Sequence, residues 1–143
     1  MIVKMDHVAI LEKKYFNKII SGEKTIESRW TYYPKEPYKQ VNIGETIYLK
    51  ESGKKVAHKA KVADTLFKEG LTSRKIKALL KKYHKNIGVE MSYFKNVKKK
   101  RYCSLVFLKD IKQIPQFNID RKGFNPRAAW ITVKNINKIK KKI

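Results

Sequence analysis

A lysine, a glutamate and an arginine fall within six residues of one another, at Lys24, Glu27 and Arg29. In this segment, KTIESRW, the apolar residues Ile26 and Trp30 alternate with polar ones. The alternation predicts a β-strand that carries Glu27 and Arg29 on the face opposite the core. The planar guanidinium of arginine pairs with a phosphate or a base edge. A neighbouring glutamate can hold it in place or accept hydrogen bonds from an exocyclic amine, and Lys24 adds a compact positive charge.

The same residues also fit a purely structural role. Glu27 and Arg29 are two residues apart on one face of the predicted strand, so they can form an ion pair that braces the sheet. An exposed pair of this kind contributes at most about 1 kcal/mol. The spacing alone leaves both roles open.

Aromatic residues and cations follow this strand. The next loop holds Tyr32 and Tyr33 near lysines, and single-stranded nucleic acids bind by stacking bases on rings and placing phosphates on cations. We expect Tyr32 or Tyr33 to be accessible and Trp30 to be packed in the core. In a later loop Arg127 is a candidate for a cleft or phosphate contact, whereas Trp130 beyond it is expected to be packed.

The chain is strongly basic. Its 143 residues include 35 Lys+Arg against 12 Asp+Glu, a formal net charge of +23. Such a charge repels itself in a compact fold and favours a polyanionic partner, with nucleic acid as the first choice and an anionic membrane surface as the second. A genome rich in A and T explains an excess of lysine over arginine, but it does not explain the shortage of acids. The lysine-rich runs 96–101 and 137–143 either follow a phosphate backbone or are merely solvated.

Patterning predicts a mostly β, α+β protein. Strands are expected at 1–11, 24–30, 101–114 and 128–136, two more strands within 45–67, helices at 12–22, 71–88 and 89–100, and loops at 31–44 and 115–127. This order predicts a small mixed or antiparallel β-barrel with flanking helices. We expect a single domain, 1–143, with a helical insertion at about 72–97 and a basic C-terminal tail.

Several other classes of site are disfavoured. The single Cys103 excludes an internal disulfide and a multi-cysteine zinc site, and it is expected in a buried strand. His7, His58 and His84 follow no zinc pattern, so no metal and no cofactor are expected. The chain shows no signal peptide and no run of about 20 apolar residues, so we expect a cytoplasmic protein that does not span a membrane.

The stretch IISGEKTIESRW resembles the signature of the ASCH domain family, part of the PUA-like superfamily. That signature is a helix, a glycine and then Lys-Thr-x-Glu-x-Arg on the following strand. Further stretches arrive in the family's order: NIGETIYL, KKVAHKAKV, YHKNIGVEMSYFKNV and RYCSLVFLKDIKQI. The resemblance covers about residues 3–133. It implies a PUA-like β-barrel with a cleft between barrel and helices, association with RNA, and a place for Lys24, Glu27 and Arg29 in or near that cleft.

The first functional hypothesis is therefore an RNA-binding module. It would recognise RNA, another single-stranded nucleic acid or a modified nucleotide in a basic cleft; protein partners stay unknown. Its expected binding residues are Lys24, Glu27, Arg29, Tyr32, Tyr33 and Arg127.

The second hypothesis is a hydrolase of a modified nucleoside or of RNA. One branch of the resembled superfamily hydrolyses acylated cytidine with a catalytic lysine, which Lys24 matches, and a nucleophilic threonine, where this chain has Glu27. The nucleophilic mechanism is therefore not transferable, although a carboxylate can act as a general base toward water. Some relatives are ribonucleases, so Lys24 and Glu27 stay open as catalytic residues.

The third and weakest hypothesis is a helix-turn-helix DNA binder built from residues 73–100. It places Met91, Tyr93 and Phe94 where polar base-reading residues would be needed.

Overall fold

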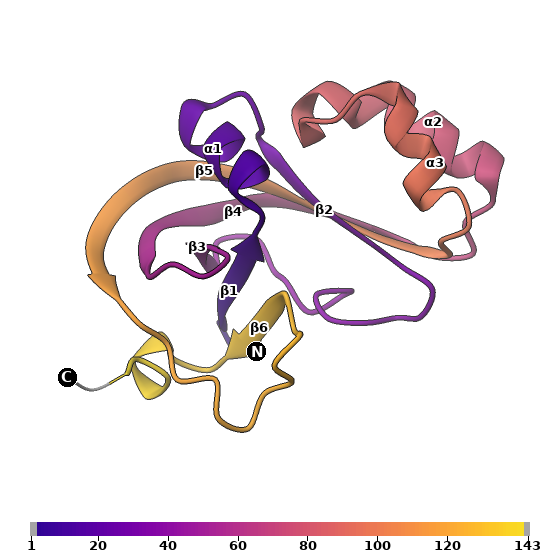
Figure 1. The fold of residues 1–143 in the computed structure, drawn as a ribbon. Helices are drawn as coiled ribbons and strands as arrows, with labels where there is room; N and C mark the ends of the chain where they lie inside the picture. Colours follow the sequence, from indigo (N-terminus) through magenta and orange to yellow (C-terminus); the bar gives the residue numbers. More distant parts are fainter. Residues whose placement is uncertain (1–2, 142–143) are drawn as a thin grey trace.

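One curled sheet of six strands forms the body of the protein (Figure 1). The structure is a computed structural model that describes residues 3–141. Its elements are β1 (Asp6–Leu11), α1 (Lys13–Ser21), β2 (Ile26–Thr31), β3 (Thr46–Glu51), β4 (Val56–Lys68), α2 (Ser73–Ile87), the 3₁₀ turn η1 (Met91–Tyr93), α3 (Phe94–Val97), β5 (Tyr102–Phe117), β6 (Trp130–Val133) and the 3₁₀ turn η2 (Ile136–Lys138). The strand order is β2-β5-β4-β3-β1-β6.

The sheet is mixed and bent into a half-barrel. Only β1 and β3 are parallel; the other neighbours are antiparallel. The long strands β4 and β5 shift register three times along their pairing, and Asp110 in β5 has a φ of 53°. Bulges of this kind bend strands and increase their twist. The expected mixed β-barrel with flanking helices is thus confirmed, as an open barrel whose edge strands are β2 and β6.

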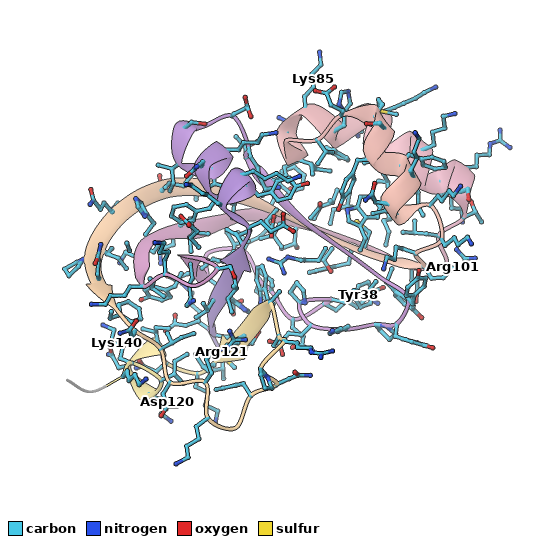
Figure 2. All side chains as sticks on the ribbon, viewed as in Figure 1. Tyr38, Lys85, Arg101, Asp120, Arg121 and Lys140 are labelled. Atoms are coloured by element: carbon cyan, nitrogen blue, oxygen red, sulfur yellow. The ribbon has the colours of Figure 1, made fainter. Side chains whose placement is uncertain are left out.

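Two helical layers flank this sheet. α1 connects β1 to β2, and α2 with α3 stands beside β2 and the ends of β4 and β5 (Figure 1). Side chains fill the curl of the sheet and the space between sheet and α2 (Figure 2). Ile76, Leu80 and Ile87 form the buried stripe of α2, Thr72 caps its first turn, and Gly88 ends it in the left-handed conformation at φ 84°. No helix among residues 3–141 is long and apolar enough to cross a membrane.

The structure changes several of the expected boundaries. The first strand begins at Asp6, and residues 1–2 lie outside the described range. β5 continues through Pro115 to Phe117, where a loop was expected, because the irregular pairing with β4 tolerates a missing amide donor. The expected basic C-terminal tail packs on the fold as far as it is described: Ile136 and Ile139 are buried in a cluster with β1 and β6, and residues 142–143 lie outside the described range.

Candidate functional site

The side chain of Arg29 bridges the gap between the β2 edge of the open barrel and its β1–β6 side, and we call this gap the seam. The residue lies on edge strand β2, and its guanidinium reaches across to the other side of the curled sheet. Its Nη1 donates to the carbonyl oxygen of Ala129 at 3.1 Å, and its Nη2 donates to that of Ile10 at 3.4 Å. Because Ile10 belongs to β1 and Ala129 directly precedes β6, one side chain links edge strand β2 to the β1–β6 side of the sheet.

Glu27 binds this guanidinium through one carboxylate oxygen. Its Oε2 accepts from Nε of Arg29 at 2.9 Å and lies 2.6 Å from Nη2. The expected placement of both side chains on one face of β2 is confirmed, and so is the ion pair that the structural alternative predicted. Four of the five guanidinium N–H groups therefore have a partner within the protein, and one N–H of Nη1 is left.

Lys24 lies on the other side of Glu27 and is almost fully buried, at 2% exposure. Its Nζ donates to the carbonyl oxygens of Ile26 at 2.7 Å and Ile87 at 2.6 Å, and it lies 3.1 Å from Oε1 of Glu27. The three acceptors match the three ammonium N–H groups. Because Ile87 ends α2, Lys24 also ties that helix to the start of β2.

Burial and charge act in opposite directions on this trio. Burial lowers the pKa of the Lys24 ammonium below its ordinary value, and Glu27 opposes that shift only in part. Burial alone would raise the pKa of the Glu27 carboxyl, but the positive charges of Arg29 and Lys24 outweigh it and lower the pKa. The carboxylate is therefore ionised at neutral pH.

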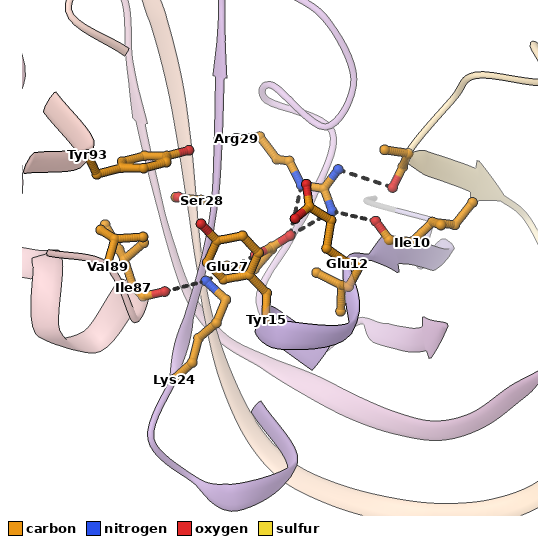
Figure 3. A pocket seen from close by; sticks show the side chains of 12 residues that line it. Ile10, Glu12, Tyr15, Lys24, Glu27, Ser28, Arg29, Ile87, Val89 and Tyr93 are labelled. Carbon is orange, nitrogen blue, oxygen red and sulfur yellow. Dashed lines mark hydrogen bonds and ion pairs between the residues drawn. The ribbon is translucent and has the colours of Figure 1, made fainter. Parts of the chain in front are cut away.

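A cavity of about 280 Å³ opens beside these three residues, and we call it the seam cavity (Figure 3). Its lining is Ile10, Leu11, Glu12, Tyr15, Lys24, Glu27, Ser28, Arg29, Ile87, Val89, Tyr93 and Ala129. Tyr15 from α1 and Tyr93 from η1 bring aromatic rings to it (Figure 3). Burial raises the pKa of Tyr93 to about 12, so this phenol stays protonated and can donate a hydrogen bond.

Two wider hollows of about 450 Å³ each adjoin the seam cavity at Arg29. Cations outnumber carboxylates in the lining of both. Lys35 and Arg127 belong to the hollow near β6, and Lys14 and Lys100 belong to the hollow near α3. The polar residues of the seam cavity are thus adjacent to two hollows whose linings carry an excess of positive charge, and we call these linings the basic rim.

The structure brings some of the predicted site residues together and leaves others outside. Lys24, Glu27 and Arg29 line the seam cavity, and Arg127 lines an adjoining hollow. Tyr32 and Tyr33 line none of the three; they are exposed at 53% and 78%. Nζ of Lys100 lies 4.0 Å from the ring centroid of Tyr32, so that ring is near the rim.

Trp130 supports Arg29 from β6. Both tryptophans are buried as expected, and the Trp130 ring lies 5.4 Å from the guanidinium carbon of Arg29. The indole N–H of Trp130 donates to Nδ1 of His7 at 3.2 Å, and Oγ1 of Thr132 lies 3.0 Å from the same nitrogen. Nε2 of His7 is hydrogen-bonded to Oε1 of Glu45 at 2.7 Å. This buried chain was not predicted from the sequence.

Other reactive residues lie away from the cavity lining. Cys103 is buried in β5 as expected, and burial raises the pKa of its thiol. His58 packs edge-on against Phe16. Within the described residues, no group of three or more His, Cys, Asp and Glu side chains could hold a metal ion.

The fold is similar to that of solved ASCH structures. The ASCH protein of Zymomonas mobilis matches with a TM-score of 0.67 at 17% identity, over 88% of this chain and 85% of that chain. Its tyrosine-to-phenylalanine variant matches with 0.70 at 16%, over 93% of each chain. A serine-to-alanine variant matches with 0.71 at 17%, over 96% and 94%. No family model and no curated protein matches the chain in sequence. The likeness confirms the ASCH-type fold that the signature predicted.

Proposed function

We propose that this protein is an RNA-binding module that takes one base or modified nucleotide into the seam cavity. The proposal rests on one observation: the seam cavity shares Arg29 with two adjoining hollows whose linings are rich in cations. A pocket of about 280 Å³ is near the lower end of the roughly 300–1,000 Å³ range of small-molecule sites. It therefore suits a single base or nucleoside better than a folded RNA segment.

The cavity offers the contacts that recognise a base. Tyr15 and Tyr93 line it, and their hydroxyls have no partner among the described hydrogen bonds. Glu27 keeps one acceptor lone pair on Oε1, and Arg29 keeps one N–H. RNA-binding domains commonly hold unstacked bases with such rings and hydrogen bonds.

The surroundings offer the contacts that hold a phosphate backbone. Lys14, Lys35, Lys100 and Arg127 surround the entrance, and the chain carries a net charge of +23. Each phosphate neutralised on a single strand contributes about 0.7 to the slope of log K against log salt concentration. The ASCH-type fold, which is associated with RNA binding, agrees with this assignment.

The test is fluorescence anisotropy with folded tRNA, single-stranded RNA and duplex DNA over a series of salt concentrations. Tyr93→Phe probes the cavity and Arg127→Ala probes the rim. Lys54→Ala is the matched control for lost charge, because Lys54 is exposed in the β3–β4 turn and lines none of the three spaces. Arg29→Ala is a poor probe, because it would also open the seam.

We expect RNA binding that survives at physiological salt and weakens by roughly 3–10-fold in Tyr93→Phe, as the loss of one hydrogen bond predicts. Arg127→Ala should lower the salt slope for RNA, and Lys54→Ala should change neither. The proposal fails if all three nucleic acids bind alike, lose affinity together with salt, and respond equally to every variant.

A hydrolase of a modified nucleoside or of RNA is the second candidate. The observation that favours it is the burial of Lys24 beside a cavity with its pKa lowered, as in many catalytic lysines. Acylated nucleosides and labelled RNA are the substrates to screen, with wild type and Glu27→Gln. Turnover that disappears in a folded Glu27→Gln supports this candidate, whereas no turnover, or turnover that survives, counts against it.

A further inference from the structure

All charged residues on the solvent face of α2 are basic. Six cations occupy exposed positions of the helix, and no Asp or Glu lies within it: Arg74, Lys75, Lys77, Lys81, Lys82 and Lys85. Lys85 points away from the body of the protein (Figure 2). None of the six forms an ion pair among the described residues.

This arrangement opposes the stability of the helix. Arg74 and Lys75 lie in the first turn, where the macrodipole disfavours positive charge. Lys77, Lys81 and Lys85 follow at intervals of four residues, where like charges repel. An anionic partner on this face would remove both penalties.

Lys75 is the third residue of the helix, a position where a glutamate or glutamine commonly stabilises the first turn. The hydroxyl of Thr72 accepts from the backbone N–H of Lys75 at 3.3 Å, which is half of a capping box. A Glu or Gln at position 75 would complete the box and favour the dipole. The chain instead presents a lysine to solvent there.

Another hollow lies beside this face, and we call it the α2 hollow. It measures about 530 Å³ and shares no lining residue with the seam cavity or its two neighbours. Its lining is Lys68, Glu69, Leu71, Lys75, Ala78, Leu79 and Lys82. Apolar side chains thus alternate with three lysines and one carboxylate. Lys75 and Lys82 are seven residues apart, or roughly 10 Å along the helix axis.

We propose that α2 and the α2 hollow form a second RNA-binding surface, for a single-stranded segment. Phosphates lie along the lysines of α2, and one base covers the apolar part of the hollow at Leu71, Ala78 and Leu79. The inference rests on the proposed RNA binding but concerns a different surface. It gives the protein two contacts on one RNA: the seam cavity selects a nucleotide, and α2 holds the neighbouring strand.

The packing of α2 favours RNA over a membrane. A basic amphipathic helix binds an anionic membrane by inserting its apolar face. In this protein that face is already used, because Ile76 and Leu80 are 0% exposed and Ile87 is 1% exposed against the sheet. Only the charged face and the α2 hollow remain for a partner.

The decisive variant is Lys75→Glu, because its two effects should have opposite signs. The completed capping box should raise the melting temperature by a few degrees. The same variant should weaken single-stranded RNA binding and lower the salt slope by about 0.7 or more, the value for one phosphate contact. Lys54→Glu, with an equal charge change in the β3–β4 turn, should leave the slope unchanged. Lys75→Gln should give the stabilisation with a smaller loss of binding.

Tyr93→Phe separates this inference from the proposed function. If Tyr93→Phe weakens RNA binding and Lys75→Glu acts no more strongly than Lys54→Glu, the α2 surface is refuted and the seam cavity stands. If Lys75→Glu alone weakens binding, the α2 surface stands and the seam proposal fails.

Binding to vesicles of phosphatidylserine and phosphatidylcholine is the second measurement. Vesicle binding that Lys75→Glu abolishes, with RNA binding intact, would overturn the RNA assignment, and so would a wild type that binds no RNA.

Discussion

The ammonium of Lys24 lies 3.1 Å from Oε1 of Glu27, at a place where the two side chains are only 2% and 8% exposed. Arg29 contacts the other carboxylate oxygen, so one negative charge lies between two positive charges. The trio keeps a net positive charge at the base of the seam cavity. It also joins the end of α2, the edge of β2 and the β1 side of the seam, so stability and ligand binding depend on the same three side chains.

Glu27→Gln is expected to destabilise the fold by roughly 3–5 kcal/mol, the usual cost of removing one partner from a buried ion pair. The variant leaves the two cations facing each other without a negative charge between them. Urea denaturation at pH 7 measures the loss. Glu23→Gln is the control, because Glu23 pairs with Lys18 at 3.7 Å and is 62% exposed. It should change the free energy of unfolding by less than about 1 kcal/mol. Equal effects of the two substitutions would contradict the buried network.

The stabilisation by Glu27 should disappear in acid. Its pKa in the folded protein lies below the ordinary 4.5 because Arg29 and Lys24 outweigh the effect of burial. A carboxyl with a lowered folded pKa stabilises the fold fully above its unfolded pKa, and the contribution is lost as pH falls through the folded pKa. The difference in unfolding free energy between wild type and Glu27→Gln should therefore be constant above about pH 5 and shrink below pH 4.5. A difference that stays constant to pH 3 would contradict the assignment.

Local patterns made much of this arrangement predictable. The alternation of Ile26 and Trp30 with Glu27 and Arg29 correctly predicted which face of β2 each residue occupies, because the strand period acts within a few residues. Patterning likewise predicted a helix at 71–88, and α2 spans Ser73–Ile87.

Contacts between distant segments were not predictable in this way. Tyr15, in the helix predicted at 12–22, was not among the expected site residues, yet it lines the seam cavity. Tyr93 joins it from a segment that carries no signal for a site. Nor could strand alternation show that Arg29 would donate to the carbonyls of Ile10 and Ala129, because those contacts depend on how far the sheet curls. The curl follows from the bulges between β4 and β5, which the chain does not mark with a glycine.

Gly88→Ala should disturb the site as well as the helix end. A Cβ at this position would lie 3.3 Å from Cδ of Lys18 and 3.3 Å from Cβ of Lys24, and the φ of +84° already disfavours a side chain. Gly22→Ala is a matched control, because Gly22 ends α1 at φ +86° with nothing within 4 Å of the added carbon. We expect a loss of about 1 kcal/mol in Gly22→Ala and about 2–3 kcal/mol in Gly88→Ala. Thermal unfolding measures both, and equal losses would show that the crowding at Lys24 costs nothing.

Arg29→Lys tests whether the guanidinium holds the seam closed. Lysine keeps the charge but loses the planar fork, so it cannot contact Glu27 through two nitrogens and still reach both Ile10 and Ala129. We expect a loss of about 2–3 kcal/mol in urea denaturation, since several charge-assisted hydrogen bonds disappear.

Hydrogen exchange then locates the effect of Arg29→Lys. The amide of Ile10 donates to the carbonyl of Ala129 at 2.9 Å, the same oxygen that accepts from Arg29. Its exchange should accelerate more than global destabilisation alone predicts, because the seam opens locally. The amide of Leu71, which donates to the carbonyl of Arg101 in another part of the fold, is the control and should follow the global change only. Equal acceleration at Ile10 and Leu71 would show that Arg29 stabilises the whole fold without closing the seam.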